Sequence, residues 1–265
     1  MQNDFDYGVL EQLDHRPWPL PDSPWVMTQT WHDLLFAHWP IEPTILVSKL
    51  PRGLELDLYD GGAWLGVVPF RMTNVAPRAV PALPWVSAFA ELNVRTYVRI
   101  GDRPGVYFFS LDAANSLAVA VARTLFHLPY HVASMDVTEQ GERIRYRSRR
   151  ESATTGTAEF GASYGPLGPA FHPDPGSLEH FLTERYCLYA VDGSEGLRRV
   201  EIHHPRWRLQ SAVATFETNA MAETNGITLP NAAPRLHFAR RQDVVAWLPT
   251  HQLQTDAFFA HSLSR

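Results

Sequence analysis

The sequence predicts an α+β fold rich in β-structure, in which an antiparallel, closed or strongly curved sheet carries a few short helices. Roughly ten to twelve short segments alternate apolar and polar residues with the period of two that is typical of strands. Hairpin-type turn residues separate them, and no regular alternation of strand and helix indicates a parallel sheet. Apolar residues make up 45% of the chain and charged residues 19%, as in ordinary folded proteins. A closed sheet of this size commonly encloses a ligand cavity, so an internal pocket is expected.

The chain is expected to divide into an arm and one domain. Residues 1–24 contain prolines at positions 17, 19, 21 and 24, which favour an extended or partly disordered N-terminal arm. Residues 25–265 are expected to form a single β-rich domain with the pocket inside. Its first element is predicted as a short amphipathic helix over residues 28–39, because the large side chains have helical spacing and a proline follows. These residues are Trp31, Leu34, Leu35, His38 and Pro40.

Hairpins and one helix follow in the first half of the domain. Residues 54–59 are predicted to pair with 63–72 across the turn at 60–62, and prolines indicate an irregular loop over 74–85. Residues 92–100 are predicted to pair with 105–111. A helix capped by Asn115 or Ser116 is predicted to run to Phe126, before Pro129.

The second half is predicted to contain further antiparallel strands. Residues 133–137 pair with 143–149, and the glycines and prolines of 161–176 predict irregular structure. Ser177 is expected to cap a short helix that ends near Glu184. Residues 185–193 and 197–204 form another predicted hairpin, and strands are expected over 212–218, 235–240 and 243–248.

Composition excludes several classes of function. A net charge of −5 gives no reason to expect a nucleic-acid partner, and no apolar run approaches the roughly 18 residues of a membrane span. The N-terminus lacks the features of a secretory signal, so a cytoplasmic protein is expected. The single cysteine, Cys187, excludes an intrachain disulfide and is expected to be buried and inert. Lys49 is the only lysine, so Schiff-base chemistry has one candidate.

The strand from residue 91 to 100 carries the strongest candidate site. Its period of two places Glu91, Asn93, Arg95 and Tyr97 on one face and apolar side chains on the other. The polar face either contacts water or lines a cavity. With Arg71 on the preceding strand, it supplies charges of both signs, which a carboxylate-bearing ligand can use.

Other motifs favour structural roles. Residues 161–165 match G-x-S-x-G, but the prolines that follow prevent the helix that a serine nucleophile requires. His203 and His204 are neighbours on a strand and point to opposite faces, so no metal site is predicted, and no cofactor is expected. The arginine stripe at 145, 147 and 149 reads as a solvated face in preference to an anion site.

Several long motifs resemble the DUF2071 or YqjF-like family of uncharacterised bacterial proteins, and the likeness extends from about Trp25 to Leu248. The motifs are HWP (38–40), LPRGLELDLYDGGAWLGVVPF (50–70), PWVSAFAELNVRTYV (84–98), GVYFFSLDA (105–113), HLPY (127–130) and LTERYCLYA (182–190). The resemblance implies an acetoacetate decarboxylase-like fold, a β-rich cone or barrel around a pocket. It therefore favours the inward-facing alternative for the row that begins at Glu91.

The same resemblance implies a departure in chemistry. In decarboxylases of that fold, a glutamate and an arginine line the pocket, and a lysine after a Gly-x-Pro element forms the Schiff base. The similar segment here is residues 126–131, in which Tyr130 and His131 stand where the family has lysines. Neither side chain forms an iminium, so acetoacetate decarboxylation by that mechanism is not expected.

Two hypotheses of function follow. In the first, a lyase- or hydratase-like enzyme acts on a small carboxylate-bearing or enolisable metabolite, with Glu91 as general acid or base, Tyr130 as proton donor, and Arg71 or Arg95 as the clamp. Asn93, Tyr97 and His131 complete the predicted pocket. In the second, the protein binds or senses such a metabolite without turnover. A protein-interaction scaffold is a third reading. The sequence does not decide whether the protein forms homo-oligomers. It also does not decide whether Asp112, Arg185 or His204 line the pocket.

Overall fold

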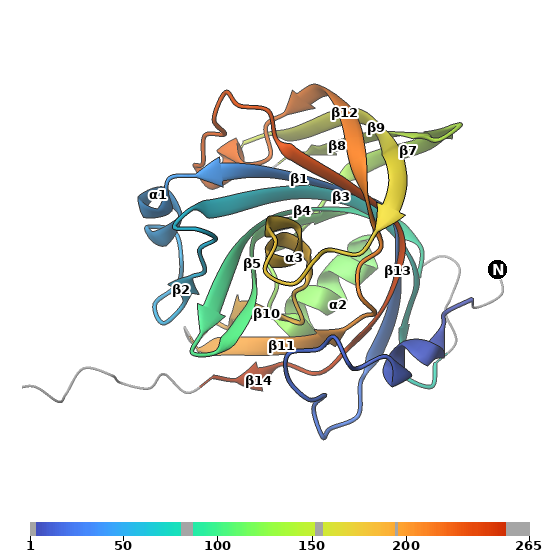
Figure 1. Ribbon diagram of the computed structural model, residues 1–265, viewed down its shortest axis with the longest axis vertical. Coiled ribbons are helices and arrows are strands. Elements are labelled where there is room, and N and C mark those ends of the chain that lie inside the picture. Colours follow the sequence, from blue (N-terminus) through green and yellow to red (C-terminus); the bar gives the residue numbers. More distant parts are fainter. Residues whose placement is uncertain (1–3, 81–86, 152–155, 194–195, 253–265) are drawn as a thin grey trace, which may run out of the picture.

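The computed structural model describes residues 4–80, 87–151, 156–193 and 196–252 and consists mainly of strands (Figure 1). The strands are β1 (Met27–Ile41), β2 (Glu55–Leu56), β3 (Ala63–Pro77), β4 (Phe89–Ile100), β5 (Arg103–Ala113), β6 (Tyr130–Val132), β7 (Ser134–Gln140), β8 (Arg143–Arg150), β9 (Ala158–Phe171), β10 (Cys187–Val191), β11 (Leu197–His203), β12 (Leu209–Asn219), β13 (Arg235–Ala246) and β14 (Thr250–His251). The helices are α1 (Pro43–Val47), α2 (Ser116–Phe126) and α3 (Leu178–Thr183), with 3-10 turns at η1 (Tyr7–Glu11) and η2 (Glu223–Asn225).

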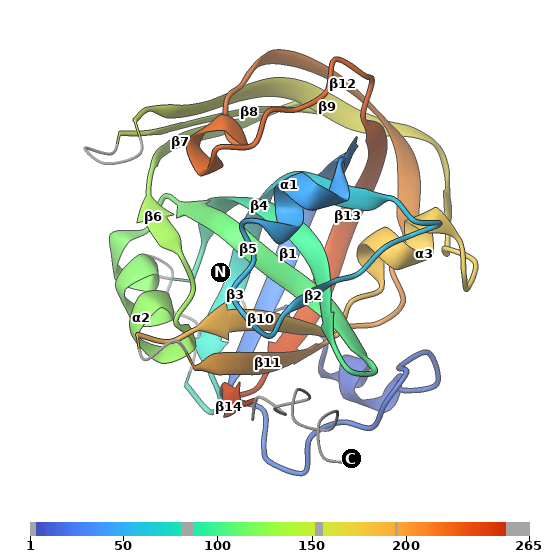
Figure 2. The ribbon, with the colours of Figure 1, turned by 90° about the vertical axis from the view of Figure 1, so that its left-hand side faces the viewer.

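One set of strands closes on itself. Neighbours follow the order β11, β10, β5, β4, β3, β1, β13, and β13 pairs again with β11 through Val245 and His203. We call this set the strand ring. Strands β12, β9, β8 and β7 continue from β13 as an outer sheet, which lies over one side of the ring in both views (Figures 1 and 2). The predicted antiparallel, strongly curved sheet is confirmed, with β5 making parallel pairs to β10 and β6.

Helices α2 and α3 lie on opposite sides of the strand ring. Figure 2 shows α2 at the left and α3 at the right, with ring strands between them. Both helices were predicted with their caps. Asn115 accepts hydrogen bonds from the amides of Leu117 and Ala118, and Ser177 accepts one from the amide of His180. These caps satisfy amides that have no partner within the helix.

Two bulges interrupt the pairing of β1 with β3. Asp33 in β1 and Asn74 in β3 both have φ of 53°, and the β1–β3 register shifts at each place. Asn and Asp tolerate this conformation better than most residues. The extra residue moves inward-facing positions by one, so Trp31 is followed by Leu34, and both line the interior.

The helix predicted over residues 28–39 is therefore wrong: β1 occupies this range. A bulge at Asp33 converts a spacing of two into a step of three. The resulting pattern at Trp31, Leu34 and His38 resembles one face of a helix. Tertiary pairing with β3 and β13 decides the outcome, because β1 lies between them.

Four other sequence predictions are corrected. The segment predicted as irregular over 161–176 is strand β9 as far as Phe171. The prolines of β9 come after Tyr164, where the pairing with β8 ends. The backbone beyond this point therefore needs no N–H donor toward β8, and proline is tolerated. Glu55 and Leu56 pair with β4 and not with β3. The strands predicted at 235–240 and 243–248 are one strand, and β3 continues to Pro77, while residues 81–86 of the expected loop lie outside the described residues.

The predicted hairpins β4–β5, β7–β8 and β10–β11 are confirmed, although residues 194–195 of the last turn lie outside the described chain. Arg147 and Arg149 in β8 are exposed and paired with glutamates, as expected for a solvated face.

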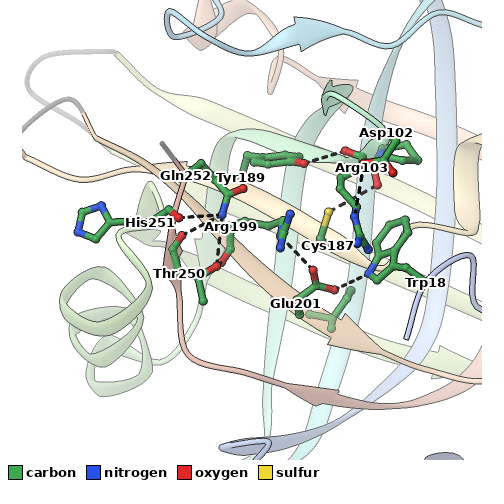
Figure 3. Close-up of polar contacts among 12 residues, drawn as sticks. Trp18, Asp102, Arg103, Cys187, Tyr189, Arg199, Glu201, Thr250, His251 and Gln252 are labelled. Carbon is green, nitrogen blue, oxygen red and sulfur yellow. Dashed lines mark hydrogen bonds and ion pairs between the residues drawn. The ribbon is translucent and has the colours of Figure 1, made fainter. Parts of the chain in front are cut away.

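The N-terminal arm packs against the strand ring. Phe5 and Val9 are buried together with residues of β13, and η1 gives the arm one turn of 3-10 helix. Further along, Arg16 and Trp18 donate hydrogen bonds of 2.6 and 2.9 Å to the carboxylate of Glu201 in β11. Figure 3 shows Glu201 between Trp18 and Arg199. Burial and hydrogen bonds hold this segment against the strand ring. The prolines of the sequence do not predict these contacts.

Candidate functional site

The strand ring encloses a cavity of about 250 Å³ that is lined mostly by apolar side chains. The wall is formed by inward-facing residues of β1, β3, β4, β5, β10 and β11, with α2 on one side and the end of α3 on the other. Eight polar side chains interrupt it: Gln29, Glu91, Asn93, Arg95, Tyr130, Thr183, Arg185 and His204. A mainly apolar pocket with a few converging polar groups is the usual form of a small-molecule site.

Three of these polar residues form one row on β4. Glu91, Asn93 and Arg95 point into the cavity, and we call them the β4 row. Leu92 and Val94 point the other way, into the core beneath the outer sheet. Strand alternation therefore places the polar face of β4 inside the ring, where the apolar wall excludes most water.

Glu91 and Tyr130 form a buried hydrogen-bonded pair. The Tyr130 hydroxyl donates to Glu91 Oε2 at 2.7 Å, and Glu91 is 3% exposed. Burial raises the pKa of Glu91 to about 8, and the charge of Asp112 adds to this, while hydrogen bonds from Tyr130 and Asn93 act in the opposite direction. Burial also raises the pKa of Tyr130 well above its ordinary value. Near neutral pH both groups hold their protons, so the pair can donate one.

Arg95 brings a positive charge to the same cavity. Its Nη2 donates to the carbonyl of Leu182 at 3.3 Å and lies 3.4 Å from the Tyr97 hydroxyl. Its guanidinium also packs over the ring of Phe36. None of the ion pairs within the described residues involves Arg95. A guanidinium without a carboxylate partner, facing an apolar cavity, is suited to bind an anionic ligand.

Tyr97 supports this site from outside the cavity lining. It is fully buried, donates from its hydroxyl to the carbonyl of Leu182 at 2.8 Å, and lies 2.6 Å from Nε2 of His38. Burial raises the pKa of Tyr97 and lowers that of His38 well below its ordinary value. These contacts connect β1 and β4 to the end of α3.

Arg71 and His131 lie elsewhere. Arg71 forms ion pairs with Asp33 and Glu139 and does not line the cavity. His131 is half-buried, also outside the lining, and burial lowers its pKa to about 4. The structure thus brings Glu91, Asn93, Arg95 and Tyr130 to one cavity, keeps Tyr97 in contact with Arg95, and separates Arg71 and His131 from them.

The sequence did not decide whether three further residues line the pocket, and the structure places two of them at the cavity. Arg185 and His204 line it, with Arg185 paired to Asp57 at 2.6 Å. Asp112 points to the opposite side of β5, where it pairs with Arg150 at 3.2 Å. The sequence reasoning missed Trp207, whose indole lines the cavity, because its segment between β11 and β12 has no strand periodicity to predict its direction.

Other sequence features have structural surroundings. The G-x-S-x-G match lies inside β9, with no strand-to-helix turn. Burial raises the pKa of the Cys187 thiol to about 12, and this side chain lies near Arg103 in Figure 3. In the described ranges, no group of three or more His, Cys, Asp or Glu side chains is placed to hold a metal ion. No helix within those ranges has the length and hydrophobicity to cross a membrane.

A wider, open cleft of about 1390 Å³ lies beside the N-terminal arm. Several arginines line it, but Arg241 is bound to Asp4 and Asp243, and Arg240 to Asp33. These partners neutralise two of the four arginines that line the cleft. The cavity inside the strand ring is the better candidate, although it is smaller, because polar groups converge there within an apolar wall.

Glu91→Gln is expected to change how stability depends on pH. The folded pKa of Glu91, about 8, lies above the ordinary 4.5, so unfolding releases a proton between these values. By linkage, this carboxyl lowers the free energy of unfolding as pH rises from 4.5 to 8, and a neutral glutamine does not. Urea unfolding at pH 5 and pH 9 should show a smaller loss in Glu91→Gln than in the wild type. The exposed Glu55→Gln variant is the control, and equal losses in all three proteins would contradict the high pKa.

Comparison with known proteins gives relatives in sequence and in fold. The model of the DUF2071 family, described as an uncharacterized conserved protein, matches residues 28–243. The uncharacterized protein YqjF of Bacillus subtilis (strain 168) is 45% identical over 239 residues, which are 90% of this chain and 98% of that protein.

Two solved structures share the fold at low identity. Acetoacetate decarboxylase from Legionella pneumophila subsp. pneumophila str. Philadelphia 1 is 12% identical, with a TM-score of 0.61 over 97% of this chain and 100% of that one. The enduracididine biosynthesis enzyme MppR complexed with pyruvate is 10% identical, with a TM-score of 0.59 over 91% and 94%. The family match and the identity to YqjF show that this chain belongs to the DUF2071 family.

Proposed function

We propose that this protein binds a small carboxylate-bearing metabolite in the cavity and acts on it by acid–base chemistry without a Schiff base. The observation that carries the proposal is that the guanidinium of Arg95, which has no carboxylate partner in the described part of the chain, and the proton-bearing pair Glu91–Tyr130 face one apolar cavity. The likeness to MppR complexed with pyruvate supports it, because pyruvate is an enolisable carboxylate bound within the same fold.

The proposed roles follow from the chemistry of each group. Arg95 binds the ligand carboxylate through two parallel N–H donors. Glu91 and Tyr130 move a proton to or from the ligand, and their hydrogen bonds stabilise negative charge that develops on an enolate oxygen. Lys49 does not line the cavity, so the proposed reaction proceeds without an iminium.

Hydrogen exchange tests this proposal. Pyruvate and acetoacetate serve as probes in D₂O, and proton NMR follows deuterium uptake at the carbon beside the ketone. An enzyme that enolises either probe accelerates its exchange above the rate in buffer. Exchange at the buffer rate for both probes, together with no binding of either by calorimetry, contradicts the proposal.

The alternative is a binding or sensing module without turnover. The observation that favours it is the closed pairing of Glu91 with Tyr130, in which each group already has a partner. This module would bind the probe carboxylates and leave their exchange at the buffer rate. Calorimetry and exchange measured on one sample separate the two functions.

Arg95→Gln is expected to weaken carboxylate binding by about 10- to 100-fold, since hydrogen bonds to charged groups contribute about 1.5–3 kcal/mol. Isothermal titration calorimetry with pyruvate measures the change. Arg99→Gln is the matched control, because Arg99 lies on the same strand but is exposed and paired with Glu55. Equal affinities for all three proteins would remove Arg95 from the binding site.

A further inference from the structure

We infer that the cavity takes a monocarboxylate with an apolar tail of about seven carbon atoms, oriented with its carboxylate at Arg95 and its tail toward α2. The inference rests on the proposed function, because it requires Arg95 to be the carboxylate site. It adds the class, size and direction of the ligand. Each of these follows from a separate feature of the cavity wall.

The carboxylate end is defined by two donors near Phe36. The guanidinium of Arg95 lies 5.3 Å from the centre of the Phe36 ring, and the Trp207 ring lies 5.0 Å from it. Trp207 is 2% exposed, and its Nε1 has no hydrogen-bond partner among the described residues. A buried N–H without a partner is costly, and a ligand oxygen at Arg95 can accept from it.

The cavity offers one carboxylate site and not two. Arg185 also lines the wall, but its charge is held by Asp57 at 2.6 Å and its Nε by the carbonyl of Phe181 at 2.7 Å. Arg95 remains the lining cation without a carboxylate partner among the described residues. A second carboxylate on the ligand would be buried without a counterion, which is strongly unfavourable. The ligand is therefore a monocarboxylate.

The tail end is apolar. From Arg95, the β4 row runs back to Glu91, and the wall beyond it is formed by α2 through Ala118, Ala122 and Phe126. On the way lie the Glu91–Tyr130 pair, which is hydrogen-bonded internally, and Asn93, whose Oδ1 has no partner among the described residues and lies nearer the carboxylate end. Hydrocarbon placed against α2 loses no hydrogen bond and gains the transfer free energy of burial.

The volume sets the length. An apolar protein cavity of roughly 150 Å³ binds benzene, which has six non-hydrogen atoms. By the same ratio, a cavity of about 250 Å³ accommodates a ligand of about ten non-hydrogen atoms. Octanoate and phenylacetate each contain ten non-hydrogen atoms. Acetate leaves most of the apolar wall uncovered, and dodecanoate exceeds the space.

A chain-length series tests the inference. Isothermal titration calorimetry at pH 7 uses n-alkanoates from acetate to dodecanoate, with octan-1-ol as the uncharged analogue. The affinity is expected to rise about fourfold per methylene, the equivalent of about 0.8 kcal/mol, and to stop rising near octanoate. Octan-1-ol is expected to bind at least tenfold more weakly than octanoate, because it lacks the charge that Arg95 recognises.

A matched pair of variants tests the direction. Ala122→Leu adds three carbon atoms to the cavity wall at α2 and should shorten the preferred alkanoate by two to three carbons. Ala120→Leu places the same side chain on the exposed face of α2 and should leave the preference unchanged. Thermal melting confirms that both variants are folded.

The carboxylate end is tested by Trp207→Phe, which should weaken octanoate binding severalfold because it removes one hydrogen-bond donor.

The outcomes separate the two proposals. If no alkanoate of any length binds, the proposed carboxylate site itself fails. If acetate binds as tightly as octanoate, the carboxylate site stands and the inference about the tail is overturned. If Ala122→Leu and Ala120→Leu change the length preference equally, or neither changes it, the direction toward α2 is wrong.

Discussion

Glu91→Gln is expected to lower the enzymatic hydrogen exchange of the pyruvate or acetoacetate probe by about 10²- to 10⁴-fold, the usual contribution of a general acid or base. Glutamine has nearly the shape of the protonated glutamic acid and accepts the hydrogen bond from Tyr130, so the cavity is preserved. It cannot exchange a proton with the ligand. The pyruvate affinity should therefore change by less than threefold while the exchange rate falls.

A second measurement distinguishes chemistry from structure. In the wild type, the exchange rate should change with pH near the pKa of Glu91, about 8. Tyr130→Phe, which removes a hydrogen bond to Glu91, should move this midpoint upward, because that bond favours the ionised form. A Glu91→Gln protein with unchanged exchange would show that Glu91 takes no part in proton transfer.

Glu201→Ala is expected to cost about 3–5 kcal/mol of unfolding free energy, the range observed when one partner of a buried ion pair is removed. The change leaves the guanidinium of Arg16, whose side chain is 1% exposed, without a counterion. It also removes the acceptor for the indole N–H of Trp18 and the partner of Arg199. Urea unfolding of both proteins at pH 7 measures the loss.

Two controls define what that loss means. Glu55→Ala breaks the exposed pair with Arg99 and should cost less than about 1 kcal/mol. Glu201→Gln retains an acceptor and should fall between the wild type and Glu201→Ala. Because Glu201 holds the N-terminal arm through Arg16 and Trp18, Glu201→Ala should also be cleaved faster by chymotrypsin within the arm, after Phe5 or Tyr7. A loss below 1 kcal/mol for Glu201→Ala would contradict the anchoring role of this carboxylate.

Sequence periodicity predicted the local elements best where a strand keeps strict alternation. The polar face beginning at Glu91 was identified in this way, because the one register shift between β4 and β5 places its extra residue in β5 and leaves the alternation of β4 intact. The bulge at Asp33 made β1 resemble a helix, since one inserted residue mimics helical spacing. The conformations of β1 and β4 both depend on strands with which they pair, some of which are distant in sequence. The pattern of residues within one strand does not identify these partners.

The sequence predicted which residues are neighbours along one strand better than it predicted the direction of side chains on other segments. Glu91, Asn93 and Arg95 were placed together by their spacing of two. Arg71 lies on the neighbouring strand, but its direction depends on the register, and it pairs with Asp33 outside the cavity. Trp207 reaches the cavity from a segment without periodicity, so the sequence gives no indication of its direction.

A crystal structure with 6-bromohexanoate tests the central claim most directly, because bromine gives an anomalous signal that marks the end of the tail. We expect the carboxylate within hydrogen-bonding distance of Arg95 and the bromine peak against Ala118 and Ala122 of α2. A bromine peak outside the cavity, or a carboxylate that does not contact Arg95 while the ligand is bound, would contradict the claim that the β4 row forms the ligand site.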